Sequence, residues 1–238
     1  MSEPIPHHIR VSLRARNVCF RMSIRDGLQV VVPRGYDLRN IPQLLERKRG
    51  WIESTERRFA RHRAEFPSEQ INHPPTQVIL PAINEVWQIH YVPRGAGSVR
   101  LRQTGPDCLT LSGNVASAVA CERALRRWLR RRGHDTLVPW LGRVSHELNL
   151  PFGKAAVRMQ KSRWGSCSRA RTISLNAKLL FLNPEVVRYL LIHELCHTVH
   201  MNHSAAYWRF VAAKEPEWRR LDKVIRMAMR SVPRWASK

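Results

Sequence analysis

The feature that most constrains this chain is an apolar segment, residues 184–199, that also carries two histidines and a glutamate. Asn183 and Pro184 form a start signal, because Asn caps helices and Pro is tolerated in the first turn. Apolar residues then recur every four positions and predict one buried helix face: Val187, Leu191, Leu195 and Val199. Burying imidazoles and a carboxylate in such a helix is costly unless they are paired or bind a metal.

The polar residues of this segment have the spacing of a catalytic metal site. His193 and His197 are four residues apart, so on a helix they share one face and can reach one ion at about 2 Å. Glu194 is rotated by about 100° from His193, beside the ion rather than bonded to it. Three protein ligands would leave a position for water, which the metal acidifies and a carboxylate deprotonates. The segment therefore predicts a metal-dependent hydrolase with Glu194 as general base.

The third ligand has two candidates, His200 and His203. The Cα of His200 would lie about 10.5 Å along the axis from that of His193, so on a straight helix the three histidines would have to stretch to reach one ion. His203 reaches the ion if the helix ends near Met201 and Asn202 and the chain turns back through a left-handed Asn. We favour His203, with His200 supporting the site or facing substrate. One zinc per chain is expected from histidine ligands, although Mn, Fe, Co and Ni also accept imidazole.

The charge and cysteine content restrict partners and compartment. With 41 Lys and Arg against 18 Asp and Glu, the net charge of +23 favours acidic partners such as nucleic acid or nucleotides. Six arginines between positions 123 and 132 could bind phosphates, although such a run is often a solvated helix face. Five scattered cysteines without a CxxC pair indicate a reducing compartment. With no secretory signal at the start and no bilayer-length apolar run, we expect a cytoplasmic chain without a membrane span.

The remaining patterns predict an α+β fold, with a β-rich part at 1–113 and a mainly helical catalytic part at 114–238. The first part has a hairpin around Asp26 and Gly27, one long helix at 41–62, a polar connection at 66–77, and short strands at 77–80, 86–92, 98–103 and 108–113. The second part has helices at 115–132 and 134–148 broken by Gly133, strands at 154–160 and 171–176, and helices after Pro184, at 205–213 and at 217–230.

A polar and aromatic loop, residues 162–170, lies between the two strands of the catalytic part. It either contacts substrate, with Arg163 as an oxyanion stabiliser, or forms a structural turn. We name Arg163, Ser166 and His200 as candidates for substrate contact. The strand at 172–176 could pair with an extended peptide. We interpret Tyr207 and Trp208 as core residues and Cys196 as a small buried residue.

Two segments resemble a known family. SRWGSCSRARTISLN at 162–176 followed by HELCHTVHMNHSAAYW at 193–208 is similar to the YgjP-like metal-dependent hydrolases, relatives of the SprT-like and WLM zinc peptidases. Weaker similarity lies in VSLRARN, DGLQVVVP and KRGWI. The resemblance implies a zincin-like catalytic part in which His193, His197 and His203 hold zinc and Glu194 is the base. The histidine spacing also matches metzincins, but His200 replaces their glycine, so we do not infer membership of that clan.

Three functions follow from these patterns. The motif and the resemblance favour a metallopeptidase acting on peptide or protein. The resemblance also permits a nucleotide pyrophosphatase on the same metal, which the positive charge would suit. A nucleic-acid-associated protein is the third alternative, because SprT-like and WLM relatives act on proteins attached to DNA. However, the sequence contains no recognition helix, RNP-type aromatic set or zinc finger.

Overall fold

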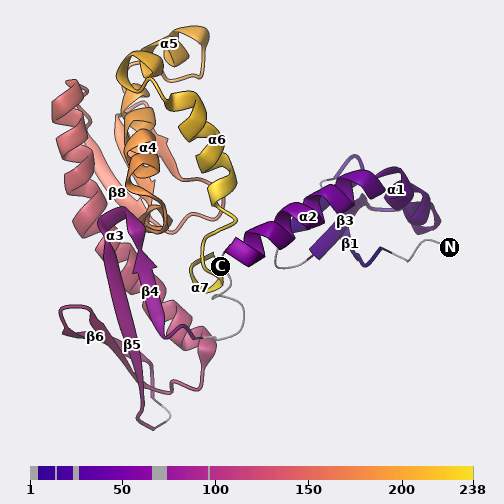
Figure 1. Cartoon of the computed structure of the whole chain (residues 1–238), viewed down its shortest axis with the longest axis horizontal. Coiled ribbons are helices and arrows are strands. Elements are labelled where there is room, and N and C mark those ends of the chain that lie inside the picture. Colours follow the sequence, from indigo (N-terminus) through magenta and orange to yellow (C-terminus); the bar gives the residue numbers. More distant parts are fainter. Residues whose placement is uncertain (1–4, 14, 24–26, 66–73, 96, 238) are drawn as a thin grey trace. The chain divides into compact units, whose positions relative to one another are not determined.

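The computed structural model describes residues 5–13, 15–23, 27–65, 74–95 and 97–237 (Figure 1). The chain divides into two units, Met1–Gln70 and Ile71–Lys238, each with its own apolar core. The expected boundary at residue 113 therefore falls inside the second unit. The predicted polar connection at 66–77 lies mostly outside the described residues.

The first unit combines a small sheet with two helices. Its strands are β1 (His8–Ser12), β2 (Cys19–Ser23) and β3 (Gly27–Pro33), in the order β1-β3-β2. β2 and β3 are antiparallel, as the hairpin prediction requires, while Asp26 lies outside the described residues. The expected long helix is two helices, α1 (Ile41–Arg47) and α2 (Arg49–Glu65), after a short 3-10 helix η1 (Leu38–Asn40). The core of this unit contains Leu28, Val30, Val32, Ile41, Leu45 and Ile52.

The second unit begins with a four-stranded sheet. Its strands are β4 (Gln77–Leu80), β5 (Glu85–Pro93), β6 (Arg100–Gly105) and β7 (Cys108–Gly113), in the order β4-β5-β7-β6, with the 3-10 helix η3 (Pro81–Ile83) after β4. β5 and β7 are parallel, whereas the two outer pairs are antiparallel. Burial alternates along β5 and β7, so one face of the sheet carries apolar residues into the core.

A single helix, α3 (Ala118–Leu148), replaces the two helices predicted at 115–132 and 134–148. Gly133 lies inside this helix without breaking it, and a side chain there would lie 3.2 Å from atoms of Ala177 and Val157. Glycine is therefore explained by the close approach of these neighbours rather than by a bend. Pro139 is exposed, so water can satisfy the carbonyl that loses its helical hydrogen bond.

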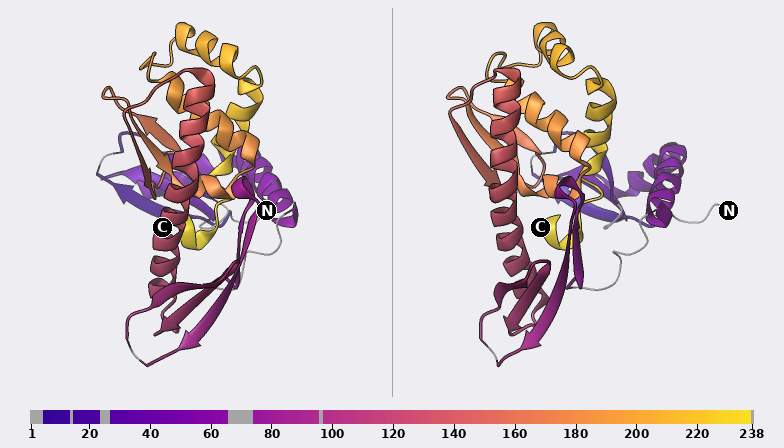
Figure 2. Two further views of the ribbon diagram at one scale, coloured as in Figure 1. Left: turned by 90° about the vertical axis from the view of Figure 1, so that its left-hand side faces the viewer. Right: turned by 60° about the vertical axis from the view of Figure 1, so that its left-hand side comes forward.

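The length of α3 explains why the second unit extends back before residue 113. Figure 2 shows α3 running past the four-stranded sheet and on along a second sheet of the same unit. Trp128 of α3 packs edge-on against Trp87 of β5, with ring centroids 5.3 Å apart. The core is therefore shared between the sheet before residue 113 and the helices after it.

The second sheet contains β8 (Lys154–Arg158), β9 (Gly165–Cys167) and β10 (Thr172–Asn176), in the order β8-β10-β9. β10 is paired on both sides, in parallel with β8 and antiparallel to β9. The prediction that residues 172–176 pair with a peptide is therefore wrong, because the backbone hydrogen bonds of that strand are already used. The edge strand is β9, which lies within the segment expected to be a loop.

The remaining elements surround one central helix. They are η4 (Ala177–Phe181), α4 (Pro184–Cys196), α5 (Ala205–Lys214), α6 (Trp218–Ala228) and α7 (Arg234–Ser237). α4 packs against α3, α5, α6 and β9, and its Val187, Leu191 and Leu195 are fully buried as predicted. Val199 instead lies beyond the end of α4 and is exposed. Strands and helices are thus mixed in both units, as expected for α+β. Across the described ranges, no helix combines the length and apolar character needed to cross a bilayer.

Candidate metal centre

Three histidines converge at the end of α4. His193 lies in the last turn of the helix, His197 follows its final residue, and His203 lies in the loop before α5. The Nε2 atom of His203 is 3.2 Å from Nε2 of His193 and 3.2 Å from Nε2 of His197. Tetrahedral zinc with Zn–N bonds of 2.0–2.1 Å separates its nitrogen ligands by about 3.3 Å. Two of the three nitrogen pairs therefore have the spacing that one such ion requires, and all three nitrogens lie within 4.8 Å of one another.

The tautomer of His197 is determined by the backbone. Its Nδ1 lies 2.9 Å from the carbonyl oxygen of His200, which can only accept a hydrogen bond. Nδ1 must therefore carry the hydrogen, which leaves a lone pair on Nε2 directed toward the other two histidines. Carbonyl oxygens that orient metal-binding imidazoles in this way are common in metal sites.

Burial keeps His193 and His197 neutral. Desolvation, together with repulsion from His197 and His203 when charged, lowers the pKa of His193 to about 3. Burial also lowers the pKa of His197, although its hydrogen bond to His200 opposes this effect. Neutral imidazole is the form that binds a metal, so both side chains are competent ligands near pH 7.

The chain returns to His203 by a different path from the predicted one. α4 ends at Cys196, earlier than expected, and the amides of Val199 and His200 donate to the Cys196 carbonyl oxygen at 3.1 and 3.0 Å. The predicted left-handed conformation of Asn202 is wrong, because its φ is not among the positive values of the described residues. A short run of turns after the helix makes the reversal instead.

His200 does not join the other three histidines. Its ring packs edge-on against Phe210 of α5, with centroids 5.4 Å apart. Its contribution to the centre is the carbonyl oxygen that orients His197. Of the two candidates for a third ligand, the fold brings His203 to the helical pair.

Aromatic rings surround the three imidazoles. Tyr207 is fully buried, stacks on His197 with centroids 4.5 Å apart, and donates a hydrogen bond of 3.1 Å to the carbonyl oxygen of His193. Trp208 stacks on His203, with ring centroids 5.5 Å apart, and also on Trp218, with centroids 4.5 Å apart. The sequence reasoning placed Tyr207 and Trp208 in the core but missed these contacts. Their position a helical turn after His203 was the available signal, whereas nothing local pointed to Trp218.

Glu194, the residue after His193, lies in a tightly closed space. Its side chain is 4% exposed, and its Oε2 has no hydrogen-bond partner among the described residues. Its Oε1 lies against Gly165 of β9, where a Cβ atom would be only 2.4 Å away. Burial raises the pKa of Glu194 to about 8. A buried carboxylate without a full set of partners is the kind of group that accepts a proton during catalysis.

The segment that carries Gly165 is held in place by buried polar groups. The Asn176 side-chain amide donates to the carbonyl oxygens of Gln160 at 2.9 Å and Arg163 at 2.7 Å. The Trp164 indole N–H donates to the Ile225 carbonyl oxygen at 2.9 Å. Sequence reasoning missed Asn176, because its role depends on contacts across the chain.

The two candidate substrate residues of this segment lie on its accessible side. Arg163 is exposed and precedes β9, and Ser166 is half-buried within β9, opposite Ser174 of β10. Cys196 is fully buried, which confirms its interpretation as a small core residue. The segment is therefore a structural support for Glu194 that also presents Arg163 and Ser166 at a sheet edge.

One known protein family matches most of the chain. No curated protein matches the chain. Among solved structures, the metallopeptidase zymogen abylysin of Pyrococcus abyssi is 30% identical, over 38% of this chain and 97% of its own, with a TM-score of 0.32. Residues 16–228 match the YgjP-like metallopeptidase domain. Because this match covers most of the sequence, including all three histidines and Glu194, the chain belongs to the YgjP-like metallopeptidase family.

Proposed function

We propose that this chain is a zinc-dependent peptidase in which His193, His197 and His203 hold the metal and Glu194 is the general base. One observation carries the proposal: three imidazole nitrogens converge, 3.2 Å apart along two of their three sides, and the residue after the first histidine is the buried Glu194. Membership of a metallopeptidase family supports the same reaction. We further propose that the catalytic part is zincin-like.

The protein groups divide the work of hydrolysis. A divalent metal in this site would supply a Lewis acid that polarises the substrate carbonyl and acidifies water. Glu194 would accept the proton of the attacking water and deliver it to the leaving amine. Its raised pKa makes the ionised carboxylate a stronger base, and the positive charge of a bound metal would favour that ionised form near neutral pH. Tyr207 would keep His193 and His197 in position through its hydrogen bond and its ring stack.

An extended peptide is the substrate that suits the edge of the second sheet. β9 pairs with β10 on one side, and its other edge has no strand partner in the part of the chain that the structure describes. A peptide could add there as a further strand, next to α4, which contacts β9. Arg163 and Ser166 are then candidates for substrate contact. The packing of the His200 ring on Phe210 favours a supporting role for His200.

Metal analysis tests the ligand assignment. We expect about one zinc per chain in the wild type and in Glu194→Gln, and loss of tightly bound zinc in His193→Ala and His203→Ala. His200→Ala is the matched control and should keep its zinc, because its ring lies on Phe210. Full zinc affinity in His203→Ala, with loss in His200→Ala, would contradict the assignment.

Substrate assays test the reaction. Zinc-loaded protein is incubated with a peptide library, and new termini are detected by mass spectrometry, while release of pyrophosphate from nucleoside triphosphates is measured in parallel. We expect peptide cleavage that is lost in Glu194→Gln. Pyrophosphate release with the same dependence on Glu194, and no peptide cleavage, would replace the peptidase by a nucleotide hydrolase.

A further inference from the structure

The six arginines between positions 123 and 132 of α3 are not equivalent in the fold. Arg126 donates to the Trp235 carbonyl oxygen at 2.8 Å and lies 3.4 Å from Glu122. Arg132 forms an ion pair with Glu85, with Nε 2.9 Å from a carboxylate oxygen. The other four are exposed and make no hydrogen bond or ion pair with any described residue: Arg123, Arg127, Arg130 and Arg131. The fold thus uses two of these charges for its own stability and leaves four facing solvent.

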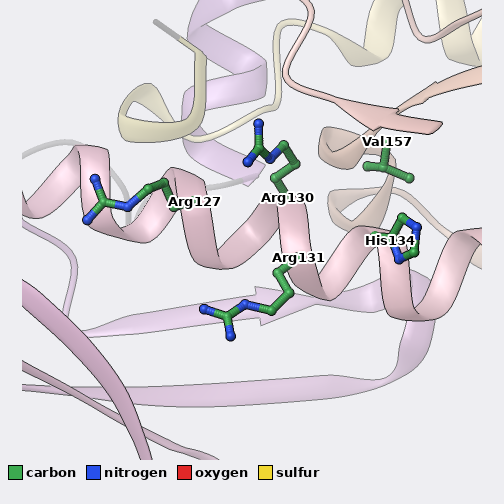
Figure 3. A pocket seen from close by; sticks show the side chains of 5 residues that line it. All are labelled: Arg127, Arg130, Arg131, His134 and Val157. Atoms are coloured by element: carbon green, nitrogen blue, oxygen red, sulfur yellow. The ribbon is translucent and has the colours of Figure 1, made fainter.

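Three of the four unpaired arginines surround one hollow. Arg127, Arg130, Arg131 and His134 line a space of about 380 Å³, together with Val157 of β8. Figure 3 shows these side chains along α3, with Arg130 and His134 on the side of Val157 and Arg131 pointing to the other side of the helix in this view. His134 lies 3.5 Å from the carboxylate of Asp135, but the three guanidinium groups have no counterion of their own among the described residues. Such a cluster produces a strong local positive potential.

We propose that this face of α3 binds the phosphodiester backbone of double-stranded nucleic acid. Guanidinium groups match phosphate oxygens in geometry as well as charge. From Arg123 to His134 the face is about 16 Å long, at 1.5 Å per residue. One strand of a duplex places a phosphate about every 3.4 Å along its axis, so the face spans about four or five phosphates. An elongated polyanion matches this length better than a single phosphate group.

Neighbouring residues favour backbone contact with a duplex. β8 packs along α3 and adds two exposed basic residues, Lys154 and Arg158, to the same unit. Trp128, the aromatic residue within the arginine run, is buried in the core and is unable to stack on a base. Binding of single strands usually depends on such stacking, whereas duplex binding through phosphates does not. The metal centre takes no part in this interaction.

The test compares two variants with equal loss of charge. In the first, Arg127, Arg130 and Arg131 are replaced by Gln; in the control, the exposed Arg21, Arg47 and Arg57 of the first unit are replaced by Gln. Binding to a labelled duplex of about 20 base pairs is measured by fluorescence anisotropy between about 50 and 200 mM salt. We expect the first variant to bind at least about tenfold more weakly, with a salt-dependence slope smaller by about 3. The control should remain within about twofold of the wild type.

Several outcomes would overturn the proposal. One is duplex affinity in the Gln variant equal to that of the wild type. Another is an equal loss of duplex affinity in the control, which would show that only the total charge matters. A third is loss of binding to inorganic triphosphate but not to the duplex, which would indicate a site for small anions. Replacement of the same three residues by Lys keeps their charge and should preserve most of the affinity, so a loss as large as with Gln would also count against it. Unchanged zinc content in the Gln variant separates this test from that of the proposed function.

Discussion

The buried carboxylate of Glu194 should make the stability of the metal-free protein depend on pH. In the folded chain the pKa of Glu194 is raised to about 8 from an ordinary value of 4.5, because burial disfavours the ionised form. Unfolding therefore releases a proton between these two pH values, and the free energy of unfolding falls as pH rises through that window. The contribution is fully present below about pH 4.5 and is lost above about pH 8. Glu194→Gln removes the titrating group and with it this dependence.

The size of the effect follows from the difference between the two pKa values. From 4.5 to about 8, at about 1.36 kcal/mol per pH unit, the upper limit is about 5 kcal/mol. Entry of water and motion of the side chain relieve part of this cost, so we expect at least about 2 kcal/mol between pH 5 and pH 8. The amide of Gln would itself lack partners in the same space, at a cost of about 1–3 kcal/mol that does not change with pH. The informative quantity is therefore the difference in slope against pH between the wild type and Glu194→Gln, because buried His193, with its pKa lowered to about 3, makes the opposite contribution below about pH 6.5 in both.

Chemical denaturation in the presence of a chelator measures this slope. Trp51 is the one tryptophan of the first unit, and the other seven of the eight lie in the second, so fluorescence mainly reports the unit that contains Glu194. The exposed Glu217 provides the control variant Glu217→Gln, which should follow the wild type. Parallel loss of stability with pH in the wild type and in Glu194→Gln would refute the reasoning.

Three further substitutions test the site and the core. Gly165→Ala puts a methyl group 2.4 Å from the buried carboxylate oxygen, and we expect bound zinc to be retained while kcat falls about 100-fold. Gly142→Ala, which meets nothing within 4 Å, should change neither, and equal kcat in both variants would contradict the expectation. Trp208→Ala removes the ring stacked on His203 and should weaken zinc binding about 10- to 100-fold in chelator competition, with recovery in Trp208→Phe; unchanged affinity in Trp208→Ala would exclude a positioning role. Leu137→Ala leaves a cavity in the buried face of α3 and should lower the free energy of unfolding by about 2–5 kcal/mol in urea, whereas a loss below about 1 kcal/mol would show that the core collapses around it.

Elements with a strong local pattern were predicted well. α4 was recognised from its start signal and its four-residue repeat of apolar residues, and the strands before residue 113 from short apolar runs between turns. Those patterns depend on neighbours along the chain, so a sequence displays them directly. The continuity of α3 was not predictable in this way. Gly133 is a helix breaker by local preference, and its role is evident only when Ala177 and Val157 lie against it.

The edge strand β9 shows the same limit. Its three residues have no strand pattern of their own and become a strand by pairing with β10. The boundary expected at residue 113 does not coincide with the observed units for a related reason. The contact between Trp87 and Trp128 belongs to a core that joins the segments on both sides of residue 113, although their sequence patterns differ.

The sequence by itself determined which residue types the candidate site offers. Two histidines four residues apart in an apolar segment, with a glutamate directly after the first, predict ligands and a base through helix geometry alone. The tertiary structure decided the rest: which histidine completes the group, which rings hold it, and which backbone closes over Glu194. His203, Trp208 and Gly165 reach the site from outside the helix, through a chain reversal and a strand pairing. Such contacts depend on the folded path of the chain, which no local spacing records.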